Sequence, residues 1–453
     1  MITQTRAAER TFAGARGSKL SARIRRLALP ILITLLVAAG AIFGPPALSD
    51  GVTGAAVSGA RLEVGWTYVL MAPVTNVLDT LSVLTLGQHY AVLATLIVVF
   101  AAWRMLRGRR RLGWLRRVGV ELGVALASLL GLATFYGYGI VGPRPMAALA
   151  VDDPDIVVVD VHSHTDRSHD ARRGFDAEAN REWHASAGFD AAYISDHRNW
   201  DGYSDAIPGN PQRAGEGTSL LPAIEIKYAR RYACALGMPW QYRNAASGNT
   251  LIQDSVYRVY RETGARPTLV LTLPSRLDSV VASRGDTLGY VAIELNDASP
   301  RGLRQSRRDR DLLLRMADSL DLALVAASNN HGWGRTAAAW TLMRIPGWQR
   351  LSPERLSAAI EAKLHADRRD ASRVVERHVP WFGESPAALA ATAPAITWGM
   401  FGAMGAAERV SWLLWTWGLT GLLLRLRPGP GDGAGRGDGA GRDRSGTVPA
   451  HTA

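Results

Sequence analysis

Long apolar segments without charged residues constrain the fold of this chain more than any other feature of its sequence. Three of them have about the 20 residues that an α-helix needs to cross the hydrocarbon core of a bilayer. A fourth is shorter and holds three tryptophans, which are typical of the membrane interface. We therefore predict a multi-pass membrane protein with about four transmembrane helices. The predicted helices are Leu27–Leu48, Leu81–Trp103, Leu122–Val141 and Val410–Leu424.

Two of these segments have alternative interpretations. The first could be a cleaved signal sequence, but further spans follow it, which favours an anchor. The apolar stretch Ala387–Ala407 precedes the fourth segment, from which Glu408 and Arg409 separate it. We predict one crossing within residues 387–424, preceded by an interfacial or tilted helix, with two crossings as the alternative.

Basic residues are concentrated beside the apolar segments. The chain has 52 Lys and Arg against 40 Asp and Glu, an excess that could suggest nucleic-acid binding. The basic residues gather in residues 1–26, in residues 104–117 and after Arg425. Because basic loops stay in the cytoplasm, these three regions are predicted to be cytoplasmic and the long polar segment extracytoplasmic. This distribution argues against a nucleic-acid binder and predicts the lipid bilayer as a partner.

Five regions follow from this pattern. The single cysteine, Cys234, excludes an internal disulfide framework. The Gly-, Arg- and Asp-rich tail cannot bury apolar surface and is predicted to be disordered. The regions are a basic cytoplasmic amino terminus (1–26), a membrane region with three transmembrane helices (27–147), a soluble domain (148–385), an apolar and transmembrane region (386–427) and the tail (428–453).

Short apolar runs alternate with helical stretches in the soluble domain. The runs are almost continuously apolar, as strands of a parallel sheet covered on both faces must be. Helical patterns at Ala177–Ala187 and Arg307–Leu320 lie between them. The alternation predicts a parallel α/β sheet or barrel. The predicted strands are Ile156–Val161, Ala191–Ser195, Leu221–Ile226, Thr268–Leu273, Tyr290–Leu295 and Leu322–Ala327.

Imidazole and carboxylate groups follow most of these predicted strands. In α/β barrels the carboxyl ends of the strands converge on one face, where active sites form. His162 and His164 are two residues apart, so on an extended strand they project from the same side. A single such residue is more often solvated, a cap or a structural group, as we expect for His184, but the constellation predicts a site for zinc, manganese or iron. Its members are Asp160, His162, His164, Asp196, His197, Glu225, Glu294, Asn296, Asp297, Asn329, Asn330 and His331.

These residues resemble the PHP (polymerase and histidinol phosphatase) superfamily of metal-dependent phosphoesterases. The family's opening signature is similar to residues 160–165, DVHSHT, with Ser168-His169-Asp170 shortly after them. Its second signature, a glycine and a strand that ends in Ser/Thr-Asp-His, is similar to residues 188–197. Glu225 fits the glutamate of the third strand, and residues 329–331 fit the late Asp-x-His motif.

The resemblance implies a distorted seven-stranded β/α barrel, combined here with transmembrane helices. It implies two or three divalent ions that activate a water and stabilise charge on the phosphoryl oxygens of a phosphorylated substrate. Asp160 and Asp196 would orient neighbouring imidazoles, and Lys227, Arg230 and Arg231 either meet an anionic substrate or are surface charge. The implied metal ligands and catalytic residues are His162, His164, His197, Glu225 and His331, with His169 or Asp170, and Asn329, as further metal ligands.

The chain also departs from the family pattern. No histidine lies between His197 and His331, where family members usually have two, one near Tyr232–Met238 and one at Thr272–Pro274. Asn329 replaces an aspartate, and Glu294 or Asp297 could compensate for it. We predict a membrane-anchored phosphoesterase that cleaves a phosphomonoester or phosphodiester outside the cytoplasm. The alternative is a degenerate barrel that binds a metal or anion as a sensor or assembly partner.

Overall fold

The computed structural model describes residues 27–106, 114–228, 231–237, 268–277 and 289–426. The disordered tail predicted for residues 428–453 and the basic amino terminus at 1–26 lie outside the described residues. The chain divides into two compact units, Leu35–Trp412 and Met1–Thr34 together with Leu413–Ala453. The larger unit contains the whole soluble region.

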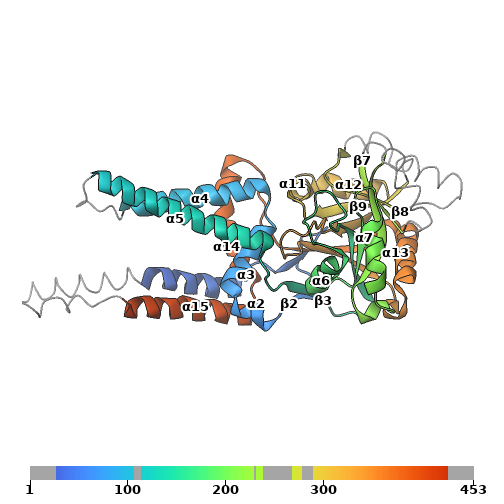
Figure 1. The fold of residues 1–453 in the computed structure, drawn as a ribbon, viewed down its shortest axis with the longest axis horizontal. Helices are drawn as coiled ribbons and strands as arrows, with labels where there is room; N and C mark the ends of the chain where they lie inside the picture. Colours follow the sequence, from blue (N-terminus) through green and yellow to red (C-terminus); the bar gives the residue numbers. More distant parts are fainter. Residues whose placement is uncertain (1–26, 107–113, 229–230, 238–267, 278–288, 427–453) are drawn as a thin grey trace, which may run out of the picture. The chain divides into compact units, whose positions relative to one another are not determined.

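A curled ten-stranded sheet with helices around it forms the soluble region (Figure 1). All six strands predicted from the sequence are present, as β4, β5, β6, β8, β9 and β10, and they run in one direction. In order across the sheet the strands are β1 (Leu48–Asp50), β12 (Arg373–Arg377), β11 (Ala339–Arg344), β4 (Ile156–Ser163), β5 (Ala191–Ile194), β6 (Ser219–Tyr228), β7 (Arg231–Leu236), β8 (Thr268–Leu271), β9 (Tyr290–Asp297) and β10 (Ala323–Ala327).

The sheet is mixed, so the expectation of an all-parallel sheet was wrong in part. Strand β7 pairs antiparallel with both β6 and β8, and β11 pairs antiparallel with β4 and β12. Only two residues separate β6 from β7, and a short connection allows antiparallel pairing whereas parallel pairing needs a long crossover. A separate two-stranded sheet consists of β2 (Ala60–Val64) and β3 (Ala147–Val151).

The curl brings the last strand of the sheet back to β4. The backbone N–H of Asn329, just after β10, donates to the carbonyl of His162 at 2.8 Å. The N–H of His164 donates in turn to the carbonyl of Asn330 at 2.9 Å. These bonds join the carboxyl ends of two strands that lie far apart in the order of the sheet.

Helix boundaries in the soluble region follow local signals. Helix α6 (Ala177–Ala187) has the predicted bounds, because the Asp176 side chain caps the N–H of Ala179 and Gly188 ends the helix in a left-handed conformation with φ 81°. The single helix predicted at Arg307–Leu320 is instead two helices, α11 (Pro300–Arg308) and α12 (Arg310–Ser319), with Asp309 between them. This region also contains α7 (Asp201–Ala206) and α13 (Pro353–Asp367), and α2 (Trp66–Leu70) and α3 (Ala72–Ser82) precede it in the chain.

Strand β4 is buried on both faces, which explains its apolar sequence. Val157, Val159 and Val161 pack into one core cluster, while Val158 packs with Trp340 into another. Burying a valine side chain contributes about 1.5 to 3 kcal/mol each. The pairing of β4 with β5 is irregular between Asp160 and Ser163, and His162 lies beside Cys234, which belongs to the same core cluster as these three valines. Packing of these valines in the core holds β4 in place, and His162 and His164 lie at the carboxyl end of this strand.

Two helices in the described residues are long and apolar enough to cross a membrane. They are α4 (Leu86–Leu106) and α5 (Trp114–Val141), and the pair α14 (Pro386–Ala403) and α15 (Ala406–Arg425), bent by 117°, gives a third if it is one span. The predicted first span is a shorter apolar helix, Leu27–Phe43, which ends before two prolines. The predicted spans that begin at Leu81 and Leu122 begin instead at Leu86 and Trp114, and residues 72–82 form α3.

Asp190 gives a testable pH dependence of stability. Its side chain accepts a hydrogen bond from the N–H of Val158 at 2.8 Å, and burial raises the pKa of Asp190 to about 6 although this bond opposes the shift. A raised native pKa means that the contribution of Asp190 to stability is complete below the unfolded pKa and is lost as pH rises through about 6. Asp190→Asn, which keeps the acceptor, should raise the free energy of unfolding at pH 8 by about 1 kcal/mol.

The check is thermal unfolding in detergent at pH 8 and at pH 4. We expect the variant to melt at the higher temperature at pH 8 and the two proteins to converge at pH 4. Equal melting temperatures at pH 8 would contradict the prediction.

Candidate metal centre

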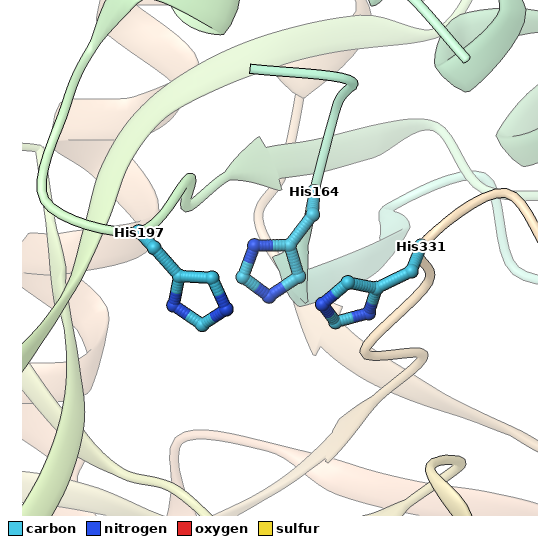
Figure 2. Close-up of side chains that lie close together, drawn as sticks. All are labelled: His164, His197 and His331. Carbon is cyan, nitrogen blue, oxygen red and sulfur yellow. The ribbon is translucent and has the colours of Figure 1, made fainter. Parts of the chain in front are cut away.

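Three histidines lie side by side at the carboxyl ends of β4, β5 and β10 (Figure 2). The ring of His164 stacks on that of His331 with centroids 4.1 Å apart, and its centroid is 4.6 Å from that of His197. One ring nitrogen from each lies within 4.8 Å of the other two, close enough to share one metal ion. The predicted convergence of strand ends therefore brings these three side chains together.

A second cluster lies beneath these rings and is buried. The Nε2 atoms of His162 and His164 are 3.0 Å apart, and Glu225 Oε2 lies 3.5 Å and 3.6 Å from them. Glu225 Oε2 is also 2.9 Å from His197 Nδ1. Two nitrogens at about 2.1 Å from one ion lie about 3 to 3.5 Å apart, so this spacing fits joint ligation. The donor set of imidazoles and a carboxylate fits zinc, manganese or iron.

The pKa shifts of His164 and Glu225 favour metal binding, whereas Cys234, Glu294 and Glu225 outweigh burial and raise the pKa of His162 well above its usual range, so an ion would have to displace its proton. Burial and the neighbouring imidazoles of His331 and His162 hold the pKa of His164 well below its usual range. Burial opposes ionisation of Glu225, but His162 and His197 outweigh it and hold the pKa of that carboxyl well below its usual range. A neutral imidazole and an ionised carboxylate are the forms that bind a metal.

Buried carboxylates extend the cluster on the other side of His162. His162 Nδ1 lies 2.8 Å from Glu294 Oε1, and Glu294 Oε2 accepts a hydrogen bond from Leu273 N at 2.6 Å. Burial raises the pKa of Glu294 to about 8, although His162 opposes the shift. With Asp297 these two residues form a further group that could hold an ion. Glu294 and Asp297 therefore lie where they could compensate for missing ligands.

His169 and Asp170 lie at the outer side of the centre. The sequence left open which of them is a ligand, and the structure places both in one group with His197. Asp170 also spans two histidines, since its Oδ2 is 3.3 Å from His197 Nε2 and its Oδ1 is 3.3 Å from His331 Nε2. Nε2 of His331 is buried and makes no hydrogen bond to the described residues, so together with Asp170 Oδ1 it could bind a ligand.

Asn329 contributes less directly than the family pattern implies. Its Nδ2 donates to Asp297 Oδ2 at 3.1 Å, and its buried Oδ1 has no hydrogen-bond partner among the described residues. Its backbone has φ 42°, a left-handed conformation that asparagine tolerates better than most residues. Asn329 lines the cavity over the centre, with an unpaired oxygen that could still bind an ion.

The two aspartates expected to orient imidazoles differ in their partners. Asp196 accepts from Ser168 Oγ at 2.9 Å, and the same hydroxyl lies 3.1 Å from His164 Nδ1, so Asp196 positions His164 through Ser168. Asp160 pairs instead with His184 Nε2 at 2.8 Å. His184 thus has a structural role, as expected, and Asp160 reaches the site through two backbone N–H groups, those of His162 at 3.2 Å and of Ser328 at 3.0 Å.

Cys234 is a residue of this centre that the sequence reasoning missed. It lies on β7, where family members usually place a histidine, and is buried beside His162. Burial raises the pKa of the Cys234 thiol to about 11, while His162 opposes the shift. The other expected histidine position has Thr272, whose buried Oγ1 has no partner among the described residues. The one indication in the sequence is that Cys234 lies within residues 232–238, where a ligand histidine was expected.

A cavity of about 990 Å³ opens over the centre. Its wall carries three basic side chains, Arg198, Lys227 and Arg301, and Lys227 Nζ lies 5.2 Å from the ring centroid of Tyr232. Lys227 was one of the predicted anion contacts. Arg230 lies outside the described residues, and Arg231 lies on β7 and does not line the cavity.

Comparisons with known proteins find similarity in solved structures only. No family model and no curated protein matches the sequence. The chain is similar to PsfC from Pseudomonas syringae, with 16% identity and a TM-score of 0.34 over 53% of this chain and 98% of that one. It is also similar to a two-domain protein from Bacteroides vulgatus that contains a predicted PHP-like metal-dependent phosphoesterase, with 12% identity and a TM-score of 0.32 over 49% and 66%.

A third similar structure is an amidohydrolase from Chromobacterium violaceum with bound sulfate and no metal. It has 15% identity and a TM-score of 0.27 over 44% of this chain and 96% of that one. The two amino-terminal motifs, residues 160–165 and 188–197, lie at the ends of β4 and β5.

Proposed function

We propose that this protein is a membrane-anchored, metal-dependent phosphoesterase built on a distorted β/α barrel of the PHP type. The observation that supports it most is the buried convergence of His162, His164 and Glu225, with the two Nε2 atoms 3.0 Å apart. Only one proton fits between two nitrogen atoms at this distance, so one nitrogen donates a hydrogen bond to the other. A divalent ion could instead accept the lone pairs of both nitrogens. Zinc, manganese or iron fits the donors.

The reaction proposed is hydrolysis of a phosphomonoester or phosphodiester. Bound ions would activate a water and stabilise charge on the phosphoryl oxygens. Arg198, Lys227 and Arg301 bring positive charge to the cavity wall, where guanidinium and ammonium groups attract and orient a phosphate. Glu225 holds Nδ1 of His197 at 2.9 Å and so directs the other ring nitrogen towards Asp170.

The second candidate function is a degenerate barrel that serves as a metal or anion sensor or as an assembly partner. Cys234, Thr272 and Asn329 at three expected ligand positions favour it. Glu294 and Asp297 favour the enzyme, because they place two buried carboxyl groups next to His162 that an ion could bind. We therefore place the enzyme first.

The test of this function is metal analysis and a phosphoester panel on the purified full-length protein. The protein would be loaded in turn with zinc, manganese and iron and assayed on phosphomonoesters and phosphodiesters. Turnover that depends on one of these metals supports the enzyme. Stoichiometric metal binding without any turnover would instead support the sensor.

We also propose that the site lies outside the cytoplasm, so that the substrate is a phosphorylated component of the envelope. The basis is the arginine content of residues 104–117 and of the chain termini. A reporter fused after Val141 should then be extracytoplasmic, and one fused after Arg117 should be cytoplasmic. The measurement is reporter activity on each side of the membrane, and the reverse pattern would overturn the orientation.

A further inference from the structure

We propose that the protein has a second, separate binding site for a phosphate group, formed by Arg307, Arg310 and Arg377 at the junction of the soluble region and the apolar helices. The three arginines line a cavity of about 370 Å³. None of the residues that line this cavity also lines the cavity over the metal centre. The proposal does not depend on the phosphoesterase activity.

The first support is the positive charge of Arg307, which is not neutralised locally. Arg307 lies on α11, and its guanidinium donates to two neutral acceptors, Gln88 Oε1 at 2.5 Å and the carbonyl of Val83 at 2.5 Å. No carboxylate forms an ion pair with it in the described part of the chain. Burial lowers the pKa of Arg307 to about 10, with Glu376 opposing, so the side chain stays charged at neutral pH.

The second support is the charge balance of the cavity. Arg310 pairs with Glu376 at 2.8 Å, and Glu376 is the single carboxylate in the described wall. Arg377 Nη2 is 3.2 Å from Asp79 Oδ2, outside the wall, but makes no hydrogen bond to the described residues. Burial lowers the pKa of His378, with Glu376 opposing, so this ring is neutral at pH 7. Arg310 and Arg377 each have a carboxylate partner, whereas Arg307 has none among the described residues, so the positive charge of Arg307 is the one available to an anion.

The third support is the position of the cavity. Val83 lies between α3 and α4, Gln88, which binds Arg307, lies in the first turn of α4, and Trp381 precedes α14. Helix α4 is one of the two helices that could cross a membrane, so the cavity would lie at the level of lipid headgroups. A guanidinium group can bind phosphate through two parallel hydrogen bonds. The ligand chemistry is therefore a phosphate, from a phospholipid headgroup or from a free phosphate compound.

The experiment measures ligand-induced stabilisation of the full-length protein in detergent with a chelator present, so that ions at the metal centre do not contribute. One arm adds inorganic phosphate at constant ionic strength, and the other adds phosphatidylglycerol, with diacylglycerol as the phosphate-free lipid control. The test variant is Arg307→Gln, and the matched control is Arg308→Gln, an exposed neighbour on α11 that pairs with Asp309.

Arg307→Gln should weaken the binding of phosphate or phospholipid by about tenfold, and Arg308→Gln should not change it. If Arg307→Gln does not fold, Arg307→Lys should still weaken binding several-fold, because lysine cannot form the paired hydrogen bonds. Stabilisation by the phospholipid alone identifies a headgroup site, by phosphate alone a soluble ligand, and by both a site open to either. Stabilisation by neither, or an equal response in wild type and the Arg307 variant, overturns the proposal.

Discussion

Replacing both His162 and His164 with alanine is expected to remove bound metal from the purified protein. The Nε2 atoms of these residues lie 3.0 Å apart, and both are within 3.6 Å of Glu225 Oε2, so one substitution pair removes two donors to a single site. A site that loses two of its few protein ligands should keep less than about a tenth of its metal at equal free metal concentration. The measurement is metal content by mass spectrometry after dialysis.

The matched control is His89→Ala with His365→Ala. Neither residue belongs to a group of described residues that could hold an ion, and both are partly buried, so the control reports the loss of two imidazoles outside the centre. The control should keep the metal content of the wild type. Equal metal content in both double variants would show that His162 and His164, at the end of β4, do not bind the metal.

Glu225→Gln is expected to lower kcat on a phosphoester by a factor of about 10² to 10⁴, since a metal-activated water provides several kcal/mol of transition-state stabilisation. Glu225 Oε2 lies close to nitrogen atoms of His162, His164 and His197. The glutamine amide of the variant is neutral, so the substitution removes the negative charge of the Glu225 carboxylate from this cluster. Glu361→Gln is the control, because the Glu361 side chain lies away from the centre and accepts hydrogen bonds from Ser357 and Thr268. We expect its kcat to stay within about twofold of wild type.

The Glu225 experiment needs melting temperatures beside the rates. If Glu225→Gln lowers the melting temperature of the metal-free protein so far that the loss of folded protein accounts for the lost turnover, the role of Glu225 is structural. If turnover is unchanged in a folded variant, Glu225 is not part of the centre.

Asn329→Asp tests the same centre in the opposite direction. Asn329 donates to Asp297 at 3.1 Å, so an aspartate there creates a like-charge pair in a buried position. A divalent ion would relieve that repulsion, and metal binding should therefore tighten while the metal-free variant becomes less stable. Metal titration followed by thermal unfolding separates the two effects, and an unchanged metal affinity would exclude an ion next to Asn329.

The strands and helices of the soluble region that could be predicted are those with local signals. The six apolar runs became β4, β5, β6, β8, β9 and β10, because a strand buried on both faces needs a continuous apolar sequence. Helix α6 was predicted to the residue because its cap, Asp176, and its terminal Gly188 are adjacent to it in the chain. Strand β7 was missed, because its pairing with both β6 and β8 depends on a short connection and not on its own composition.

The sequence by itself determined which residues could bind a metal, because the residue types and their spacing at the ends of predicted strands are local properties of the chain. It placed His162, His164, His197, Glu225 and His331 at strand ends. Only the tertiary structure decided which of them meet and what else joins them. The curl of the sheet stacks His331 on His164, the antiparallel β7 brings Cys234 beside His162, and the fold pairs Asp160 with His184. These contacts join residues from strands and helices distant in sequence, so their geometry depends on how the sheet curls and packs and not on any local pattern.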